Sequence, residues 1–271
     1  KNTPLTMRKL DLNKYENILV DMDGVVLMQE KLILKADKAL EELMNITDVY
    51  ILSNNDTKTR NQIADRLDKF GLNLPPSNII NSTFLMAKYL MDQCGRTKVF
   101  VLGERGLRLE LEEFGHKLVQ PTEAEVIVVG TERDITYEKF NRALTALLGG
   151  AEFYVANADR TFPTADGEAP GAGTTVGGIK GMGFSPDKYV CKPSKTAAET
   201  AMEIAGTTNP SSCLLIGDRL DVDILTAERV GMDSILVLTG AESRESLENS
   251  EIRPTYVFES LYELTGRRIL S

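Results

Sequence analysis

The chain has 271 residues, enough for about two domains, and carries a net charge of −9. Charged residues at 26% and hydrophobic residues at 42% describe an ordinary globular protein. The negative charge argues against binding to nucleic acid or to an anionic membrane, since phosphate surfaces are held by Lys and Arg. No stretch approaches the ~18 apolar residues of a membrane helix.

Cysteine and histidine usage narrows the chemistry further. Cys94, Cys191 and Cys213 are far apart and form no CxxC pair, so neither a disulfide framework nor a zinc site is indicated. The polar stretch 1–16 lacks the apolar segment of a signal peptide, and we expect a cytoplasmic protein. His116 is the only histidine, which disfavours a Ser-His-Asp mechanism, and we expect it to be an exposed loop residue.

The first predicted strand, 18–20, is followed directly by Asp21, Met22, Asp23 and Gly24. Ligand and catalytic groups of open α/β sheets collect at the carboxyl ends of the strands. Asp21 and Asp23 therefore read as a pair of catalytic or metal-binding acids. The alternative is an Asp-rich turn in which Gly24 supplies a positive φ.

The second predicted strand, 49–52, ends at Ser53 and Asn54. A hydroxyl and amides before a helix can donate hydrogen bonds to phosphate oxygens. The alternative is plain N-capping by Asn55 or Asp56. Amphipathic stripes predict helices over 36–44, 63–70, 140–148 and 223–230.

The segment from about residue 84 to 187 has strands of its own, which we expect at 98–102, 125–129 and 153–156. It can bury a core alone and reads as a cap inserted into a discontinuous core of residues 1–83 and 188–271. Its glycine-rich stretches, 166–173 and 177–183, suit loops. Neither contains a P-loop or GxGxxG spacing.

Two later apolar runs end in the same manner. The run 189–191 precedes Lys192, and the run 213–216 precedes Asp218 and Asp223. The alternatives are a surface lysine before a helix and a capped helix start. Four strand ends that carry acids, hydroxyl, lysine and acids in order favour a shared site.

This order resembles the haloacid dehalogenase superfamily of phosphatases, with signatures at Asp21–Val25, Ser53–Asn55, Lys192–Pro193 and Gly217–Asp218 with Asp223. The long insert, with Asn157, Asp159 and Phe162, resembles the NagD-like branch that contains 4-nitrophenyl, phosphoglycolate and pyridoxal phosphate phosphatases. The resemblance runs from about residue 17 to 240. Two departures are visible, Cys191 where Gly is usual and Ala158 where Pro is common.

The resemblance implies a doubly wound, Rossmann-like parallel-sheet core with an inserted α/β cap. It also implies Mg²⁺ held by the carboxylates of Asp21 and Asp218 and the main-chain carbonyl of Asp23, while Asp223 orients the metal's surroundings or Lys192. Asp21 would be the nucleophile and Asp23 the proton carrier. The resemblance assigns phosphate binding to Ser53, Asn54 and Lys192, and we assign substrate selectivity to the cap residues Asn157, Asp159 and Phe162.

The expected function is therefore Mg²⁺-dependent hydrolysis of small phosphate monoesters through an aspartyl-phosphate. The natural candidates are phosphoglycolate, glycerol or sugar phosphates, pyridoxal phosphate and nucleotides. Two alternatives remain, a phosphotransferase or phosphomutase that uses the same aspartate, and a receiver-like module that carries a phospho-aspartate. A small phosphate ester is the expected partner, and a homodimer is left open.

Overall fold

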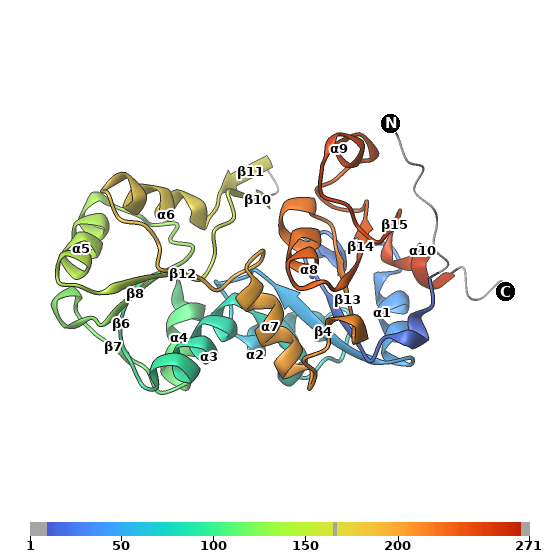
Figure 1. Cartoon of the computed structure of the whole chain (residues 1–271), viewed down its shortest axis with the longest axis horizontal. Helices are drawn as coiled ribbons and strands as arrows, with labels where there is room; N and C mark the ends of the chain where they lie inside the picture. Colours follow the sequence, from blue (N-terminus) through green and yellow to red (C-terminus); the bar gives the residue numbers. More distant parts are fainter. Residues whose placement is uncertain (1–9, 165–166, 267–271) are drawn as a thin grey trace. The chain divides into compact units, whose positions relative to one another are not determined.

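The computed structural model describes residues 10–164 and 167–266. Strands and helices alternate along the chain, which confirms the predicted α/β class (Figure 1). One sheet has six strands, and a separate sheet of five strands is formed by the inserted segment. By contacts, the chain divides into unit 1 (residues 1–52, 70–72 and 201–271) and unit 2 (residues 53–69 and 73–200). Domain boundaries at 84 and 187 stay a prediction.

The six-stranded sheet has the order β15-β14-β13-β1-β4-β5. Its strands are β1 (Asn17–Val20), β4 (Asp48–Ser53), β5 (Ile79–Asn81), β13 (Cys213–Gly217), β14 (Asp233–Val237) and β15 (Tyr256–Phe258). β1 pairs in parallel with both β13 and β4, and all four of its residues are buried. A continuous apolar run is typical of a strand that is buried on both faces.

The helices attached to this sheet follow the apolar stripes read from the sequence. α1 (Ala36–Met44) buries Ala36, Ala39, Leu40 and Leu43 and packs with α10 (Leu261–Gly266). α8 (Leu225–Val230) packs on β14 and ends at Gly231, whose φ of 74° is the left-handed C-cap conformation. The remaining elements are η1 (Leu12–Lys14), β2 (Leu27–Met28), β3 (Lys31–Leu32), α7 (Lys195–Ile204), η4 (Pro210–Ser212), η5 (Leu220–Ile224) and α9 (Arg244–Asn249).

The five-stranded sheet is parallel, in the order β12-β9-β8-β6-β7. Its strands are β6 (Lys98–Leu102), β7 (Lys117–Leu118), β8 (Val126–Val129), β9 (Glu152–Val155) and β12 (Lys188–Tyr189). Phe100, Ile127 and Phe153 from this sheet form one buried cluster with side chains of α5 (Tyr137–Leu148) and α6 (Ala172–Gly181). The inserted segment therefore has a core of its own, as the sequence predicted.

Unit 2 also contains α2 (Arg60–Asp68), η2 (Pro76–Asn78), α3 (Ser82–Cys94), α4 (Arg105–Glu113), η3 (Pro121–Glu123) and the hairpin β10 (Thr161–Thr164) and β11 (Gly167–Pro170). No helix among the residues 10–164 and 167–266 is long and apolar enough to cross a membrane.

Three local expectations were wrong. The first is that both glycine-rich stretches are loops: residues 167–170 of the first stretch form strand β11, which pairs with β10. Most of the stretch 177–183 is helix, because α6 continues to Gly181, and a Cβ at Gly178 would lie 2.4 Å from the ring of Phe140 on α5. The absent side chain lets the two helices approach closely. His116 is only 4% exposed, since its Nε2 donates to Ala87 O at 2.9 Å and its Nδ1 accepts from Thr97 N at 3.3 Å.

The run 189–191 is the third difference. Only Lys188–Tyr189 form a strand, β12, and it pairs with β9 of the five-stranded sheet. Lys192 therefore follows the edge strand of the inserted sheet, whereas the sequence had grouped it with the core strands.

Candidate active site

Asp21 directly follows β1, and its N–H donates to Ile216 O of β13 at 2.8 Å. The chain then turns sharply, because Gly24 adopts a φ of 87° and its N–H donates to Leu27 O at 2.7 Å. The alternative interpretation of this segment, an Asp-rich turn, included this positive φ, which glycine adopts readily. The turn leads into the short hairpin of β2 and β3. Asp23 lies in the turn, before the hairpin, and is half-buried.

Asp218 follows β13, the strand beside β1, and its carboxylate is closely surrounded. A Cβ at Gly24 would lie 2.3 Å from Asp218 Oδ2, and a Cβ at Gly240 would lie 2.0 Å from the same atom. Ala241 N donates to this oxygen at 2.8 Å. Backbone from two other loops therefore fixes the position of the Asp218 carboxylate, and only glycine permits that approach.

Asp223 lies in η5, a single π-helical turn that precedes α8. Such turns are frequent at functional sites. Its Oδ2 accepts from Arg219 N at 3.1 Å, and a Cβ at Gly217 would lie 2.2 Å from the Asp223 Cβ. The wide turn brings this side chain back toward the end of β13.

The carboxylates of Asp21, Asp218 and Asp223 form one cluster in unit 1. One oxygen of each lies within 4.8 Å of the others, and the three residues are 8%, 5% and 1% exposed. Like charges that are this close and this buried repel strongly, so the cluster suits a cation. Of the predicted ligands, Asp21 and Asp218 are brought together, and Asp223 lies equally close although we expected it only to orient them.

The predicted phosphate-binding residues lie in unit 2. Ser53 ends β4, and its Oγ accepts from Asn55 N at 3.1 Å. Asn54 holds the backbone of Lys192 on both sides: its Oδ1 accepts from Lys192 N at 2.9 Å, and its Nδ2 donates to Lys192 O at 3.1 Å. Lys192 is only 2% exposed, so the surface-lysine alternative is wrong.

Two of the predicted selectivity residues belong to the same hydrogen-bond network. Asn54 Nδ2 also donates to Asp159 Oδ1 at 3.2 Å, and Asp159 N donates to Asn157 Oδ1 at 2.8 Å. Phe162 lies separately, half-buried on β10 of the hairpin. The structure thus links Asn157 and Asp159 to Asn54 and Lys192.

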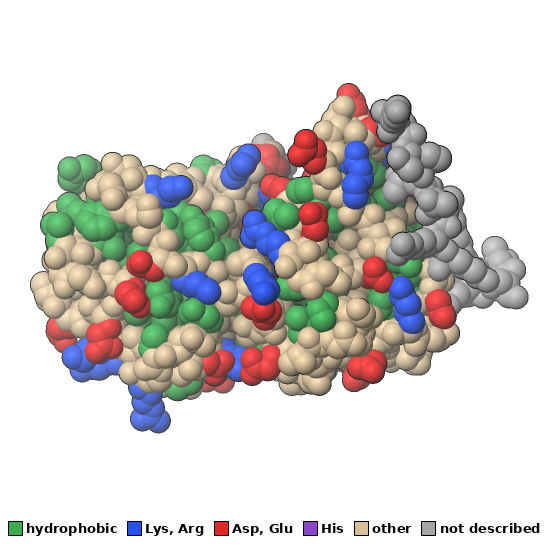
Figure 2. All heavy atoms as spheres, in the orientation of Figure 1, with side chains coloured by type: hydrophobic (Ala, Val, Ile, Leu, Met, Phe, Trp, Pro, Cys, Tyr) green, Lys and Arg blue, Asp and Glu red, His purple; other side chains and the backbone are tan. Residues whose placement is uncertain are grey.

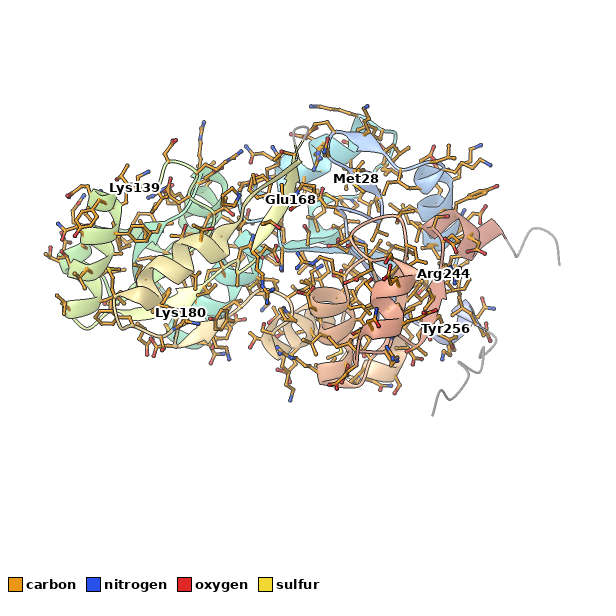
Figure 3. All side chains as sticks on the ribbon, turned by 90° about the horizontal axis from the view of Figure 1, so that it is seen from above. Met28, Lys139, Glu168, Lys180, Arg244 and Tyr256 are labelled. Atoms are coloured by element: carbon orange, nitrogen blue, oxygen red, sulfur yellow. The ribbon has the colours of Figure 1, made fainter. Side chains whose placement is uncertain are left out.

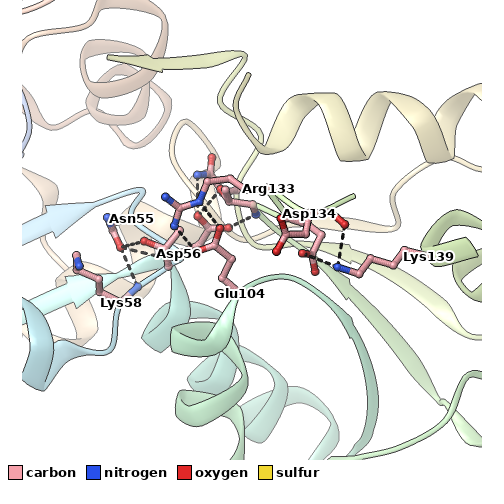
Figure 4. Close-up of polar contacts among 11 residues, drawn as sticks. Asn55, Asp56, Lys58, Glu104, Arg133, Asp134 and Lys139 are labelled. Carbon is pink, nitrogen blue, oxygen red and sulfur yellow. Dashed lines mark hydrogen bonds and ion pairs between the residues drawn. The ribbon is translucent and has the colours of Figure 1, made fainter. Parts of the chain in front are cut away.

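Asp56 is the residue whose role sequence reasoning missed (Figure 4). It is 1% exposed, and its carboxylate accepts from Thr131 Oγ1 at 2.8 Å, from Thr131 N and from Asn157 Nδ2 at 3.1 Å. Burial raises the pKa of Asp56, and these donors act against that rise. A Cβ at Gly130 would lie 2.2 Å from its Oδ2, so a glycine is needed there.

The sequence had offered Asn55 or Asp56 as the cap of α2. The N-cap is instead Thr59, which forms a capping box with Gln62. Asn55 accepts from Thr57 N and Lys58 N within the preceding turn. Asn55 and Asp56 were both candidate caps for one helix, and this surplus was the signal in the sequence that Asp56 had another use.

Comparisons with known proteins agree with this geometry. A profile described as haloacid dehalogenase-like hydrolase matches residues 18–117, and a related HAD-hydrolase-like profile matches residues 189–264. An acid sugar phosphatase of Staphylococcus aureus is 31% identical over 255 residues, which cover 93% of this chain and 97% of that protein.

Solved structures give the same result. The p-nitrophenyl phosphatase from Archaeoglobus fulgidus is 34% identical, with a TM-score of 0.89 over 93% of this chain and 99% of that one. A 4-nitrophenylphosphatase from Thermotoga maritima is 28% identical, with a TM-score of 0.89 over 94% and 98%. NagD from E. coli is 27% identical, with a TM-score of 0.84 over 92% and 98%.

Proposed function

The chain belongs to the haloacid dehalogenase-like hydrolases of the NagD and 4-nitrophenyl phosphatase type, and on this premise we propose that it hydrolyses small organic phosphate monoesters with Asp21 as nucleophile. The observation that carries the proposal is the buried cluster of Asp21, Asp218 and Asp223 at the carboxyl ends of β1 and β13. Sugar phosphates are the first candidate substrates, because one relative is an acid sugar phosphatase.

The donor set fits Mg²⁺, which prefers oxygen ligands and shares them with substrate phosphate. We propose that the carboxylates of Asp21 and Asp218 and the main-chain carbonyl of Asp23 hold the ion. Asp223 lies close enough to orient them or to bind directly. When bound, Mg²⁺ offsets the negative charge of the nucleophile and of the phosphoryl oxygens.

The protein's own residues carry the steps. An Asp21 carboxylate oxygen attacks phosphorus in line, the bond to the ester oxygen breaks, and Asp23 donates a proton to that leaving oxygen. Asp23 then takes a proton from the water that attacks the aspartyl-phosphate, which releases phosphate and restores Asp21. We assign binding of the phosphoryl oxygens to Ser53, to the backbone amides that follow it and to Lys192. Asn54 holds the backbone of Lys192 in place.

Selectivity for the leaving group is assigned to Phe162 and Asp159. The ring of Phe162 is half-buried on a hairpin, where a substrate could touch it. Asn157 is 6% exposed, with its amide bonded to Asp56 and Asp159, so we propose that it acts by positioning Asp159.

Phosphate release from a panel of phosphorylated metabolites and 4-nitrophenyl phosphate tests the function. We expect hydrolysis of small esters, complete loss in EDTA, recovery with Mg²⁺, and inhibition by Ca²⁺, whose larger and more flexible shell disturbs in-line geometry. The variant Phe162→Ala should change relative rates among metabolites more than turnover of 4-nitrophenyl phosphate. Full activity after exhaustive dialysis against EDTA would contradict the metal assignment.

The same assay separates the alternatives. A phosphotransferase would pass the phosphoryl group to a second substrate hydroxyl when one is supplied, and the yield of free phosphate would fall accordingly. A receiver-like module would hold its phospho-aspartate and release little phosphate. We expect one phosphate to be released for each ester consumed, both with and without a second substrate hydroxyl.

A further inference from the structure

Unit 2 contains a cavity of about 210 Å³ that involves none of the residues assigned to catalysis. It lies over the five-stranded sheet, where α4 supplies Arg108 and α5 supplies Lys139 and Arg142. Glu132, Gln120 and Phe100 also line it. Figure 3 shows Lys139 on α5, and Figure 4 shows its contacts.

The charges in this cavity do not balance. Lys139 Nζ lies 2.9 Å from Glu132 Oε1, so these two groups neutralise each other. Arg108 and Arg142 remain, and within residues 10–164 and 167–266 neither forms an ion pair with a carboxylate. The cavity therefore carries two positive charges in a chain whose net charge is −9.

Both guanidinium groups have only neutral hydrogen-bond partners. Arg108 donates from Nε to Gly103 O at 3.2 Å and from Nη2 to Val101 O at 2.8 Å. Arg142 donates from Nη2 to Gln120 Oε1 at 2.9 Å and lies 5.1 Å from the ring centre of Phe100. A guanidinium has five N–H donors, so most of those on each residue are left for a ligand.

The two arginines also repel each other. Burial lowers the pKa of Arg108, the carboxylates of Glu132 and Glu112 act in the opposite direction, and the neighbouring charge of Arg142 adds to the lowering. An anion placed between two half-buried cations removes this repulsion. Guanidinium groups match the paired oxygens of phosphate with two parallel hydrogen bonds.

The size of the cavity limits the ligand. About 210 Å³ exceeds the ~30 Å³ of one water, so a group of several atoms fits. It falls below the ~300 Å³ at which pockets for drug-sized ligands begin, which disfavours a nucleotide. We propose that Arg108 and Arg142 form a second anion site, which takes a doubly charged phosphate group, either free phosphate or the phosphate of a small ester.

Calorimetric titration of inorganic phosphate in EDTA tests the proposal on the full chain with Lys192→Met, which weakens the catalytic site. We expect one remaining binding event. Adding Arg142→Gln should weaken it at least about tenfold, because charge-assisted hydrogen bonds are lost. Glu132→Gln should tighten binding, since it releases Lys139. The control is Arg105→Gln, which should change nothing, because Arg105 is an exposed arginine at the start of α4, the helix that carries Arg108, and lies outside the cavity.

Three results would overturn the site: no phosphate binding in the Lys192→Met chain, binding unchanged by Arg142→Gln, or equal loss with Arg105→Gln. Further titrations identify the source of the anion. Glycerol 3-phosphate that binds about as tightly as phosphate identifies an ester ligand, whereas binding of phosphate and sulfate alone identifies a free oxyanion. Chloride or nitrate that binds equally well would reduce the effect to general screening and contradict the proposal.

Discussion

Gly24 and Gly240 have no side chain, and this leaves space for the Asp218 carboxylate. A methyl group at Gly240 would lie 2.0 Å from Asp218 Oδ2, so the carboxylate must move. We expect Gly240→Ala to weaken the binding of Mg²⁺ about 10–100-fold, which is the usual effect of removing the contacts that hold a metal ligand in place. Titration of activity with Mg²⁺ measures this.

The control for that variant is Gly181→Ala at the end of α6, where a Cβ meets nothing within 4 Å. It should leave the Mg²⁺ requirement unchanged. If Gly240→Ala behaves in the same way, the Asp218 carboxylate does not depend on its glycine neighbours and our reading of the metal site is wrong.

The two aspartates of the first turn should be separable by kinetics. Asp21→Asn removes the nucleophile, so no phosphoryl-enzyme should form. Asp23→Asn keeps the nucleophile, and 4-nitrophenyl phosphate, whose leaving group needs no proton, should give a burst of nitrophenolate followed by a stall. Glycerol phosphate needs the proton, so its burst should vanish. General acid–base catalysis is worth ~10²–10⁴-fold, and rapid-quench kinetics resolves such a contrast.

Equal losses without a burst on both substrates, in the Asp23 variant, would show that this division of roles is mistaken. Asp23→Glu provides a further check, since it keeps a carboxyl group but moves it. Its rate with glycerol phosphate should lie between those of the wild type and of Asp23→Asn.

At the scale of elements, Asp56 joins the loop after β4 to the loops after β8 and β9 through Thr131 and Asn157. In Asp56→Asn one oxygen is replaced by an NH₂ group, which faces a donor. We expect the free energy of unfolding to fall by about 1–3 kcal/mol, the penalty for an unsatisfied buried group. Urea unfolding measures it, and the exposed Asp134→Asn should change little. An equal effect of both variants would contradict the role of Asp56.

Asp233, the first residue of β14, ties that strand to η1. It accepts from Lys14 Nζ at 2.8 Å and from the Tyr15 hydroxyl at 2.7 Å. Burial acts to raise the pKa of Asp233, but these hydrogen bonds prevail and lower it. A lowered pKa means that the carboxylate stabilises the fold above its unfolded value of ~3.9 and that this contribution disappears as the pH falls.

Asp233→Asn should therefore lower the free energy of unfolding by about 1 kcal/mol at neutral pH, a modest value because Lys14 and Asp233 are both partly exposed. The difference from the wild type should shrink below about pH 4. Urea unfolding at both pH values checks this, with the exposed Asp48→Asn as control. A difference that does not change with pH would refute the linkage.

A strand could be predicted from the sequence where a single apolar run was enough to identify it. The apolar runs that became β1, β4, β6 and β13 lie on the chain within a residue or so of their predicted bounds. The partner of a two-residue strand such as β12 could not be read, because its pairing depends on β9, which lies more than thirty residues earlier. The π turn at η5 likewise has no local signature.

The same limit holds for single residues. Asp21 and Asp218 could be singled out because each follows an apolar run, and the structure places both carboxylates in one buried cluster at the ends of neighbouring parallel strands. Asp56 and His116 were misread, because their partners are distant in sequence. Thr131 lies 75 positions from Asp56, and Ala87 lies 29 positions from His116. A polar residue is exposed or buried according to such partners, which a local pattern does not contain.

At the scale of the whole molecule, each compact unit has a hydrophobic core, and charged and apolar side chains are interspersed over the surface that Figure 2 shows. The cysteines are distributed unequally between these environments. Cys94, at the end of α3, is exposed, while Cys191 and Cys213 are 1% and 0% exposed. Burial raises the pKa of the Cys191 thiol to about 12 and also raises that of Cys213.

To a thiol reagent the native protein therefore offers one site, since the thiolate is the reactive form and the other two thiols are covered. Cys191 belongs to unit 2 and Cys213 to unit 1, so each becomes reactive only when its own unit opens. Timed alkylation followed by mass spectrometry should show Cys94 modified first. The rates at which Cys191 and Cys213 are modified afterwards would report the opening of unit 2 and of unit 1 separately. No engineered label is needed, because all three cysteines are natural residues.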